Sequence, residues 1–213
     1  MLTTAFVVAA TISALLAIAA DWNERRHSTF YILKPLTTLL IIGIATAAPA
    51  GDAKLMLLAA LGLSMLGDIC LMFDGEKWFM GGLGSFLLAH LLFIPVLLHG
   101  VSHPSLPLWS AALALYGIVL FAWLLPKAGA LKLPVIVYGL ALMGLAFAAI
   151  ARWYAHPDAS TQMSLAGALL FVLSDSSLAI RKFVGPYAGA QAVILSTYWA
   201  AIGLIACAAT LPG

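Results

Sequence analysis

The sequence predicts an all-α membrane protein, a polytopic bundle of eight transmembrane helices that forms one integral membrane domain over residues 1–213. Three observations predict this class. The chain is 64% hydrophobic and only 8% charged, whereas roughly a quarter of the residues of a soluble domain are charged. Its apolar runs lack the alternation of barrel strands. Polar breaks divide them into segments of about 19–23 residues, long enough to cross hydrocarbon as helices.

The predicted spans follow one another with short connections, which leave no room for a separate soluble domain. The breaks DWNERRHST, PAGDAK, DGEK, GVSHPS, PKAGALK, AHPD and VGPYAG separate them. The spans cover approximately residues 2–20, 30–48, 54–73, 81–99, 107–125, 133–153, 162–183 and 187–209. The first ends in AIAA, as a signal peptide would, but no Lys or Arg precedes it, so we expect a retained span. Two cysteines in apolar segments, Cys70 and Cys207, are expected to be packing residues.

The basic residues are divided unevenly between the two predicted sides of the membrane. One side holds Arg25, Arg26, Lys34, Lys77, Lys127, Lys132, Arg181 and Lys182, and the other holds Lys54 and Arg152. Short cytoplasmic loops carry an excess of Lys and Arg, so the first side is predicted to be cytoplasmic and both termini non-cytoplasmic. We expect a multi-pass protein of a bacterial inner membrane. Aromatic residues near the predicted boundaries suit interfacial belts: Trp22, Trp78, Phe79, Trp109, Trp153, Tyr154 and Tyr187.

The two halves of the chain, residues 1–100 and 101–213, look related. Aligning LGLSMLGDICL with ALLFVLSDSSL brings Asp68 onto Asp175. Four crossings in each half predict a parallel 4+4 repeat, related by an axis along the membrane normal.

Asp68 and Asp175 are the predicted catalytic residues. The other acidic residues fall in polar breaks, whereas a carboxyl group inside a membrane span is costly and marks a functional site by default. At 1.5 Å per residue, Asp68 lies about 7–8 Å and Asp175 about 12 Å from the cytoplasmic ends of their spans. We therefore expect one shared site that faces one cavity. The alternative is that a Ser, Tyr or Lys satisfies each carboxyl separately, for structure alone.

Further candidates could bind a substrate beside the aspartates. Lys34 opens its span at the cytoplasmic interface, where it could contact a phosphate or could snorkel to lipid headgroups. Two tyrosines within spans, Tyr138 and Tyr198, carry hydroxyls that need partners when buried. Ser64 lies one helical turn before Asp68 and could share its face.

His90 lies in the middle of the fourth span. An imidazole in the bilayer core should find a partner, although a lone His is more often a hydrogen-bonded core residue than a ligand. His99, His103 and His156 fall at the outer side, away from the aspartates. The sequence therefore predicts no three-ligand zinc site and no other metal.

Several other function classes are excluded by motif. The chain has no G-x-S-x-G elbow, no P-loop and no dinucleotide fingerprint. Gly67 and Asp68 are similar to part of the intramembrane aspartyl protease motif, but G-x-G-D is absent because residue 65 is Met. The basic residues are spread over several loops, so no nucleic-acid partner is expected.

Six motifs together resemble the lysoplasmalogenase (YhhN-like) family of multispan membrane proteins. They extend over about residues 30–205 in the family's order. They are KPLTTLL from Lys34, LGDICLMF around Asp68, AHLLF at His90, the stretch of Pro134 and Tyr138, LSDSSLAIRKF around Asp175, and STYWAA at Tyr198.

The resemblance implies a lysophospholipid substrate in the membrane. Members hydrolyse the vinyl ether bond of lysoplasmalogens to a fatty aldehyde and glycerophosphocholine or glycerophosphoethanolamine, without a metal or other cofactor. Such a bond breaks by protonation of its β-carbon and capture of the resulting oxocarbenium ion by water. Two carboxyls in low dielectric can share one proton, and we expect Asp68 and Asp175 to divide the acid and base roles. Lys34, with Arg181 or Lys182, is expected to bind the phosphate.

Two other functions fit the same residues. Parallel repeats with paired intramembrane acids also build proton-coupled transporters of small or lipid-like substrates. A lipid-binding or structural membrane protein is the third alternative. The headgroup preference, the order of the acid and base roles and the oligomeric state stay open at this point.

Overall fold

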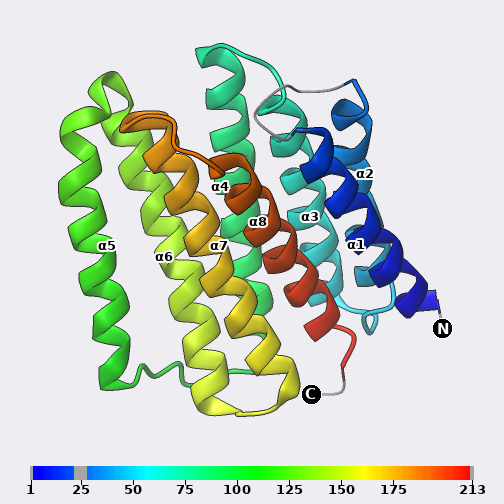
Figure 1. The fold of residues 1–213 in the computed structure, drawn as a ribbon. Helices are drawn as coiled ribbons and strands as arrows, with labels where there is room; N and C mark the ends of the chain where they lie inside the picture. Colours follow the sequence, from blue (N-terminus) through cyan, green and yellow to red (C-terminus); the bar gives the residue numbers. More distant parts are fainter. Residues whose placement is uncertain (1, 22–27, 212–213) are drawn as a thin grey trace.

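The computed structural model describes residues 2–21 and 28–211, and over these residues the chain folds into eight α-helices without a strand (Figure 1). They are α1 (Leu2–Ala20), α2 (Phe30–Ala45), α3 (Asp52–Cys70), α4 (Glu76–Leu98), α5 (Ala111–Leu124), α6 (Lys132–Ala155), α7 (Ala159–Phe183) and α8 (Ala190–Ala208). Short 3₁₀ turns flank α5 at Leu108–Ser110, Leu125–Lys127 and Gly129–Leu131. The predicted fold class is confirmed. Arg25 and Arg26, which contributed to the predicted orientation, and Trp22, which was expected at the membrane interface, lie outside the described residues.

Seven of the described helical segments are long and apolar enough to cross a membrane. The exception is α2, whose 16 residues rise about 24 Å, against a hydrocarbon thickness of about 30 Å. Turns continue the chain beyond its C-terminus, with backbone hydrogen bonds from Ala47 to Ile44 and from Ala48 to Ala45. The chain is therefore an integral, multi-pass membrane protein.

The largest difference from the predicted boundaries is at α4, which begins at Glu76 rather than at residue 81. Gly75 has φ of +115°, which breaks the chain direction, and the helix starts directly after it. Glu76 lies in the first turn, where a negative charge is favoured by the helix dipole. The polar residues of the break thus form the first turn of the helix instead of a loop.

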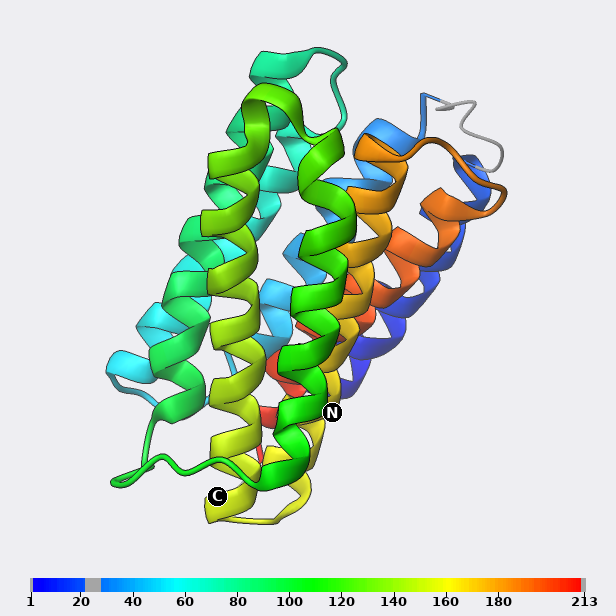
Figure 2. The ribbon, with the colours of Figure 1, turned by 90° about the vertical axis from the view of Figure 1, so that its left-hand side faces the viewer.

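Successive helices run in opposite directions, so that both termini lie at one end of the bundle (Figures 1 and 2). The turns after α3, α5 and α7 lie at the opposite end, together with the start of α2. This is the alternation that eight crossings require. It brings Lys34, Lys77, Lys127 and Arg181 to one end. Which end faces the cytoplasm stays a prediction.

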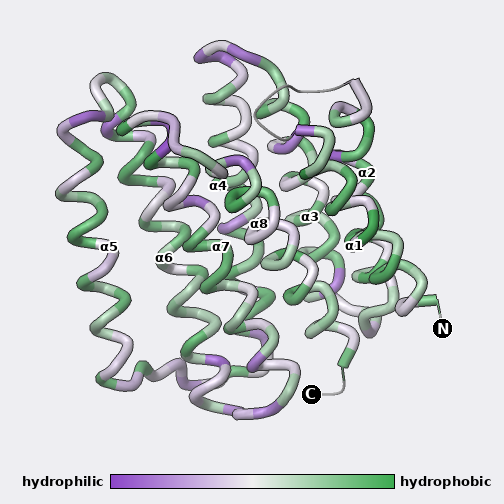
Figure 3. Tube along the Cα trace, in the orientation of Figure 1, coloured by the Kyte–Doolittle hydropathy of each residue, from purple (hydrophilic) through white to green (hydrophobic). Residues whose placement is uncertain are grey.

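Hydropathy follows this arrangement, because hydrophilic residues gather at the ends of the bundle and apolar residues cover the helices between them (Figure 3). The outer helix α5 exposes Leu115, Ile118 and Val119. In a membrane these side chains meet lipid rather than water. Only a few hydrophilic positions lie within the apolar zone, and they are where the candidate site is found.

Four of the packed helix pairs have a counterpart when four is added to each label, whereas α1–α8 and α5–α7 have none of comparable extent within the described residues. The pairs α1–α2, α2–α3, α3–α4 and α2–α8 correspond to α5–α6, α6–α7, α7–α8 and α6–α4, and all of them pack. This is the pattern that a parallel repeat produces. The repeat itself stays a prediction.

A capping box fixes the start of α7, the helix that carries Asp175. The Asp158 carboxylate accepts a hydrogen bond from the Thr161 backbone N–H at 2.8 Å, and the Thr161 hydroxyl accepts one from the Asp158 backbone N–H at 3.0 Å. The bond from Thr161 lowers the pKa of the Asp158 carboxyl below its ordinary value. The first residue of α7 is thereby fixed by polar groups at the end of the bundle.

We expect Gly167→Ala to destabilise the protein, because α7 packs closely against α8 at this position. A Cβ at Gly167 would lie 2.7 Å from the Ala201 carbonyl oxygen and 2.9 Å from Ile205. Such overpacking typically costs about 1–3 kcal/mol. Unfolding in mixed detergent micelles measures the loss.

The matched control is Gly203→Ala, on the neighbouring helix α8. A Cβ at Gly203 meets nothing within 4 Å, so Ala should leave stability unchanged or raise it through its better helix propensity. Equal effects of the two substitutions would contradict the close α7–α8 packing.

Candidate active site

Asp68 lies near the end of α3 with its side chain buried at 2% exposure. Its Oδ2 accepts hydrogen bonds from the Thr38 hydroxyl at 2.6 Å and the Tyr198 hydroxyl at 2.8 Å. The Lys34 Nζ lies 3.6 Å from Oδ1 and donates to the Asp68 backbone carbonyl at 3.1 Å. Three donors from α2 and α8 therefore converge on this carboxyl group. A carboxylate, which only accepts hydrogen bonds, matches that set.

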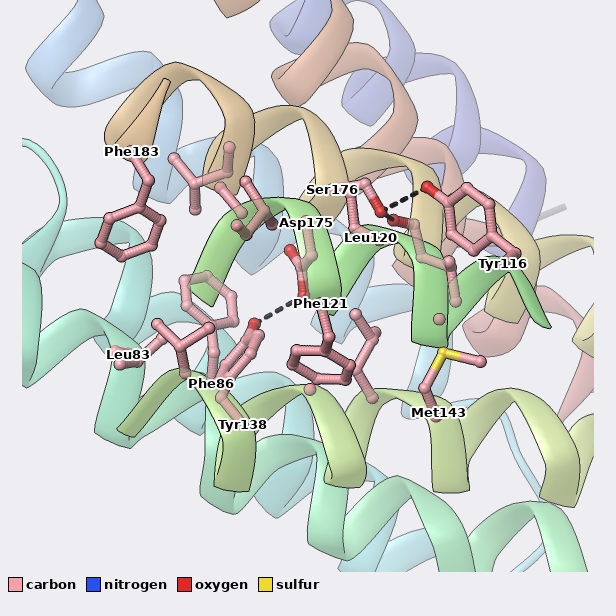
Figure 4. A pocket seen from close by; sticks show the side chains of 18 of the residues that line it. Leu83, Phe86, Tyr116, Leu120, Phe121, Tyr138, Met143, Asp175, Ser176 and Phe183 are labelled. Atoms are coloured by element: carbon pink, nitrogen blue, oxygen red, sulfur yellow. Dashed lines mark hydrogen bonds between the residues drawn. The ribbon is translucent and has the colours of Figure 1, made fainter. Parts of the chain in front are cut away.

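Asp175 lies in the middle of α7 and has different surroundings. The Tyr138 hydroxyl of α6 donates to its Oδ2 at 2.6 Å (Figure 4). The His90 Nε2 of α4 lies 3.7 Å from the same oxygen, beyond hydrogen-bonding distance. The side chain of Asp175 is 10% exposed, because it borders a cavity.

The surroundings of the two aspartates correspond under the 4+4 relation of the helices. Asp68 on α3 meets groups from α2 and α8, and Asp175 on α7 meets groups from α6 and α4. Each carboxyl is thus held by the preceding helix of its own half and by the last helix of the other half.

One aromatic ring joins the two clusters. The Phe171 ring lies 5.8 Å from the Tyr198 ring and 4.7 Å from the His90 ring, centroid to centroid. His90 in turn lies 5.1 Å from the Tyr138 ring. Asp68 and Asp175 therefore belong to one continuous buried network, although α3 and α7 do not pack extensively on each other within the described residues.

An apolar cavity of about 80 Å³ lies between α4, α5, α6 and α7. Figure 4 shows Asp175 and Tyr138 in its wall, Phe183 and Leu83 toward one end, and Tyr116 and Met143 toward the other. Its outer wall is α5, which the Tyr116 hydroxyl ties to Ser176 of α7 at 2.8 Å. The cavity suits a hydrocarbon chain, and Asp175 adds a carboxyl group to its wall.

A second, basic cavity of about 280 Å³ adjoins the apolar one. Polar side chains line it: Lys34, Asp74, Arg181, Lys182 and Gln191. Leu71, Phe79 and Leu178 border both cavities. A lipid with a phosphate and a hydrocarbon chain could therefore place one part in each.

Lys34, Arg181 and Lys182, the residues expected to bind a phosphate, line the same basic cavity, and the phosphate site itself stays a prediction. The guanidinium of Arg181 donates to the Gln191 side-chain carbonyl, and the Lys182 ammonium lies 4.4 Å from the centre of the Phe79 ring. Lys34 is only 5% exposed and also neutralises Asp68. It links the basic cavity to the aspartate network.

Ser64 lies apart from the other predicted residues. Its hydroxyl donates to the Ala60 carbonyl at 2.9 Å, within its own helix, and the side chain is fully buried. Ser64 therefore fills the interior of the bundle, and the structure gives it no contact with either cavity.

Two contributing residues were not among the predicted ones. Thr38 donates the shortest hydrogen bond to Asp68, and it also accepts one from the Trp199 indole at 3.3 Å. Its position four residues after Lys34, on the same helix face, was a signal that could have identified it. Gln191 reaches the basic cavity from the start of α8, and no local pattern indicates this.

No group of three or more His, Cys, Asp or Glu side chains that could hold a metal ion occurs within the described part of the chain. Cys70 and Cys207 are free thiols.

Comparisons with known proteins agree with the sequence pattern. A sequence model of the YhhN family matches residues 29–209. The chain is 35% identical over 177 residues to the Sus scrofa protein named lysoplasmalogenase TMEM86B, covering 82% of this chain and 72% of that protein. It is 32% identical over 174 residues to a Mycobacterium bovis protein named lysoplasmalogenase, covering 78% of this chain and 63% of that protein. An Escherichia coli protein named uncharacterized membrane protein YhhN is 28% identical over 173 residues, covering 79% and 80%. No solved structure matches the chain.

We expect Lys34→Met to destabilise the protein strongly, because it leaves the buried Asp68 carboxylate without its cation. Removing one partner of a buried ion pair typically costs about 3–5 kcal/mol. Asp68→Asn in the same chain removes the unpaired charge, so the double variant should lose less than the sum of the two single losses. Unfolding in mixed detergent micelles gives the four stabilities.

Lys132→Met is the control, since Lys132 is exposed at the start of α6 and should be replaceable without loss. Additive losses in the double variant would show that the Lys34–Asp68 pair contributes nothing specific.

Proposed function

The chain belongs to the YhhN family, and on that basis we propose that it hydrolyses the vinyl ether bond of lysoplasmalogens, releasing a fatty aldehyde and glycerophosphocholine or glycerophosphoethanolamine. Its relatives from Sus scrofa and Mycobacterium bovis are named lysoplasmalogenase. The observation that carries the proposal is the pair of adjoining cavities, one basic and one apolar, with an aspartate in the wall of the apolar one.

The cavities suggest how such a substrate lies. Its phosphate binds to Lys34, Arg181 and Lys182 in the basic cavity, where charge-assisted hydrogen bonds are strong. The glycerol passes the border formed by Leu71 and Phe79. The alkenyl chain follows the apolar cavity toward Met143 and continues past α5 into the bilayer. The vinyl ether, next to the glycerol, then lies near Asp175.

Asp175 is the better candidate for the acid. It lines the apolar cavity, and its hydrogen bond from Tyr138 leaves capacity for a proton of its own. Asp68 faces three donors, including the Lys34 ammonium, and these favour its ionised form. We therefore assign the proton to Asp175 and the negative charge of the pair to Asp68.

The reaction follows from this assignment. The Asp175 carboxyl gives its proton to the β-carbon, and the electron pair of the C=C bond forms the new C–H bond. The α-carbon and the ether oxygen then share a positive charge, which nearby carboxylates stabilise in low dielectric. Water adds to the α-carbon and loses one proton to a carboxylate. The hemiacetal breaks its bond to the glycerol oxygen, which takes up a proton as the aldehyde forms.

Asp68 contributes in a different way, since it does not line the apolar cavity. It accepts the hydrogen bond of Tyr198, whose ring contacts the Phe171 ring beside His90. The negative charge of Asp68 therefore lies behind Asp175, away from the wall of the apolar cavity. The base role expected for one carboxyl of the pair therefore falls to Asp175 itself, because the ring of Phe171 between the two clusters cannot carry a proton.

The direct test is hydrolysis by the purified protein in detergent, supplied with lysoplasmenylethanolamine. Aldehyde should appear without any ion gradient. Asp175→Asn should lower the rate by at least about 100-fold, since general acid catalysis contributes on the order of 10²–10⁴. Asp68→Asn should also abolish most of the activity by removing the charge of the network. Aldehyde release is followed by a coupled dehydrogenase assay.

Both variants must remain folded for the result to count, which their elution as monodisperse species reports. If Asp175→Asn keeps more than a few per cent of the rate, the aspartate mechanism is wrong. If the wild-type protein moves a lysolipid across liposomes without hydrolysing it, the carrier alternative is favoured instead.

Gly117→Leu should shorten the chain that the apolar cavity accepts. A Cβ at Gly117 would already contact Met143 at 3.4 Å, and a longer side chain would fill that end of the cavity. We expect kcat/KM to fall by about tenfold for a long alkenyl chain relative to a short one, as expected when apolar contacts in a pocket are lost. Steady-state kinetics on two chain lengths measures the ratio.

Gly62→Leu on α3 is the matched control, because a Cβ there meets nothing within 4 Å and the position lines neither cavity. An unchanged chain-length ratio for Gly117→Leu would place the alkenyl chain elsewhere.

A further inference from the structure

His90 has an unusual environment for a polar side chain in a membrane. It is fully buried, and neither ring nitrogen has a hydrogen-bond partner among the described residues. Its ring packs edge-on against the aromatic rings of Tyr138 and Phe171. Buried polar groups nearly always have a partner, so an imidazole with two unsatisfied nitrogens indicates a ligand.

The geometry identifies the position of that ligand. The His90 Nε2 and the Asp175 Oδ2 are 3.7 Å apart, too far for a direct hydrogen bond but suited to one molecule that contacts both. Asp175 borders the apolar cavity and His90 lies behind it, so the Asp175 carboxyl is the side from which a small molecule can approach. Tyr138 occupies one direction of approach to Oδ2, since its hydroxyl already donates to that oxygen.

We propose that His90 holds the water molecule that captures the oxocarbenium ion. The inference rests on the proposed function and adds a residue for its second step. When Asp175 has given its proton to the β-carbon, it becomes a carboxylate beside that water. The water oxygen forms the bond to the α-carbon, and its proton passes to the Asp175 carboxylate. Asp175 is thereby returned to its protonated form, and no further reactant is needed.

This role differs from that of a residue that only orients Asp175. A positioning residue would help the first step, protonation of carbon. A residue that holds the water acts on the second step alone. Without such a residue, the β-carbon is still protonated, but the oxocarbenium ion is captured by water more slowly and returns a proton to Asp175. The two roles therefore predict different fates for unreacted substrate.

The experiment compares the wild-type protein with His90→Phe in D₂O, using lysoplasmenylethanolamine of Z geometry. His90→Phe should hydrolyse it at least about 100-fold more slowly. The recovered substrate should contain deuterium at the vinylic β-carbon or have become the E isomer, because the intermediate rotates and returns. Wild-type protein should leave recovered substrate unlabelled. Mass spectrometry and proton NMR of the recovered lipid measure both.

His90→Gln keeps a polar group that can bind water and should retain activity within about tenfold of the wild type. It also keeps the inference testable if the Phe variant does not fold. His99→Phe, the same substitution at an exposed position at the end of α4, should leave hydrolysis and label unchanged.

Slow hydrolysis by His90→Phe without label or isomerisation would overturn the inference, because the first step would then be the one affected. Wild-type rates in His90→Phe would also overturn it. A wild-type protein that hydrolyses no vinyl ether would instead overturn the proposed function, and this inference with it.

Discussion

The packing of the helices is constrained by two carboxyl groups inside an apolar bundle, because a carboxyl group without partners is unfavourable there. Each needs donors, and those donors can come only from neighbouring helices. Asp68 accepts hydrogen bonds from α8 and α2, and Asp175 accepts one from α6, with His90 of α4 at 3.7 Å. The helices that carry these partners must therefore pack around the two aspartates. Packing that separated them would leave a charge or a hydroxyl unsatisfied in lipid.

The two aspartates have corresponding helices around them, but their immediate partners differ. Lys34 forms an ion pair with Asp68 and neutralises its carboxylate. At Asp175 the equivalent space borders a cavity, and the group from α4 is a histidine that makes no direct hydrogen bond. In the proposed assignment, Asp68 is the ionised member of the pair within a hydrogen-bonded network, and Asp175 is a carboxyl that borders the apolar cavity. If the two halves are repeats, they have diverged so that Asp68 is paired with a cation and Asp175 is open to a cavity.

Much of this arrangement could be predicted from the sequence, because lipid makes hydropathy a strong signal. The helices, the two buried acids and the basic residues at one end follow from composition and spacing alone. Lys34, Tyr138 and Tyr198 were predicted to lie beside the aspartates, but which of them reaches which carboxyl could not be predicted. Tyr198 is 130 residues from Asp68, and only the closed bundle brings them together. Thr38 was overlooked because a threonine in an apolar span is usually satisfied within its own helix. The cavities depend on side chains from four helices and leave no linear pattern.

The position of Asp175 relative to the two cavities connects the fold to the chemistry. A lysolipid is anchored in the interface by its phosphate and in hydrocarbon by its chain, so its ether bond has a fixed depth. The border at Leu71, Phe79 and Leu178 lies at the junction of the basic and apolar cavities, and Asp175 lies just beyond it on the apolar side. In the proposed reaction, an acid at this depth meets the first bond of the chain. The membrane would then help to align the substrate with Asp175.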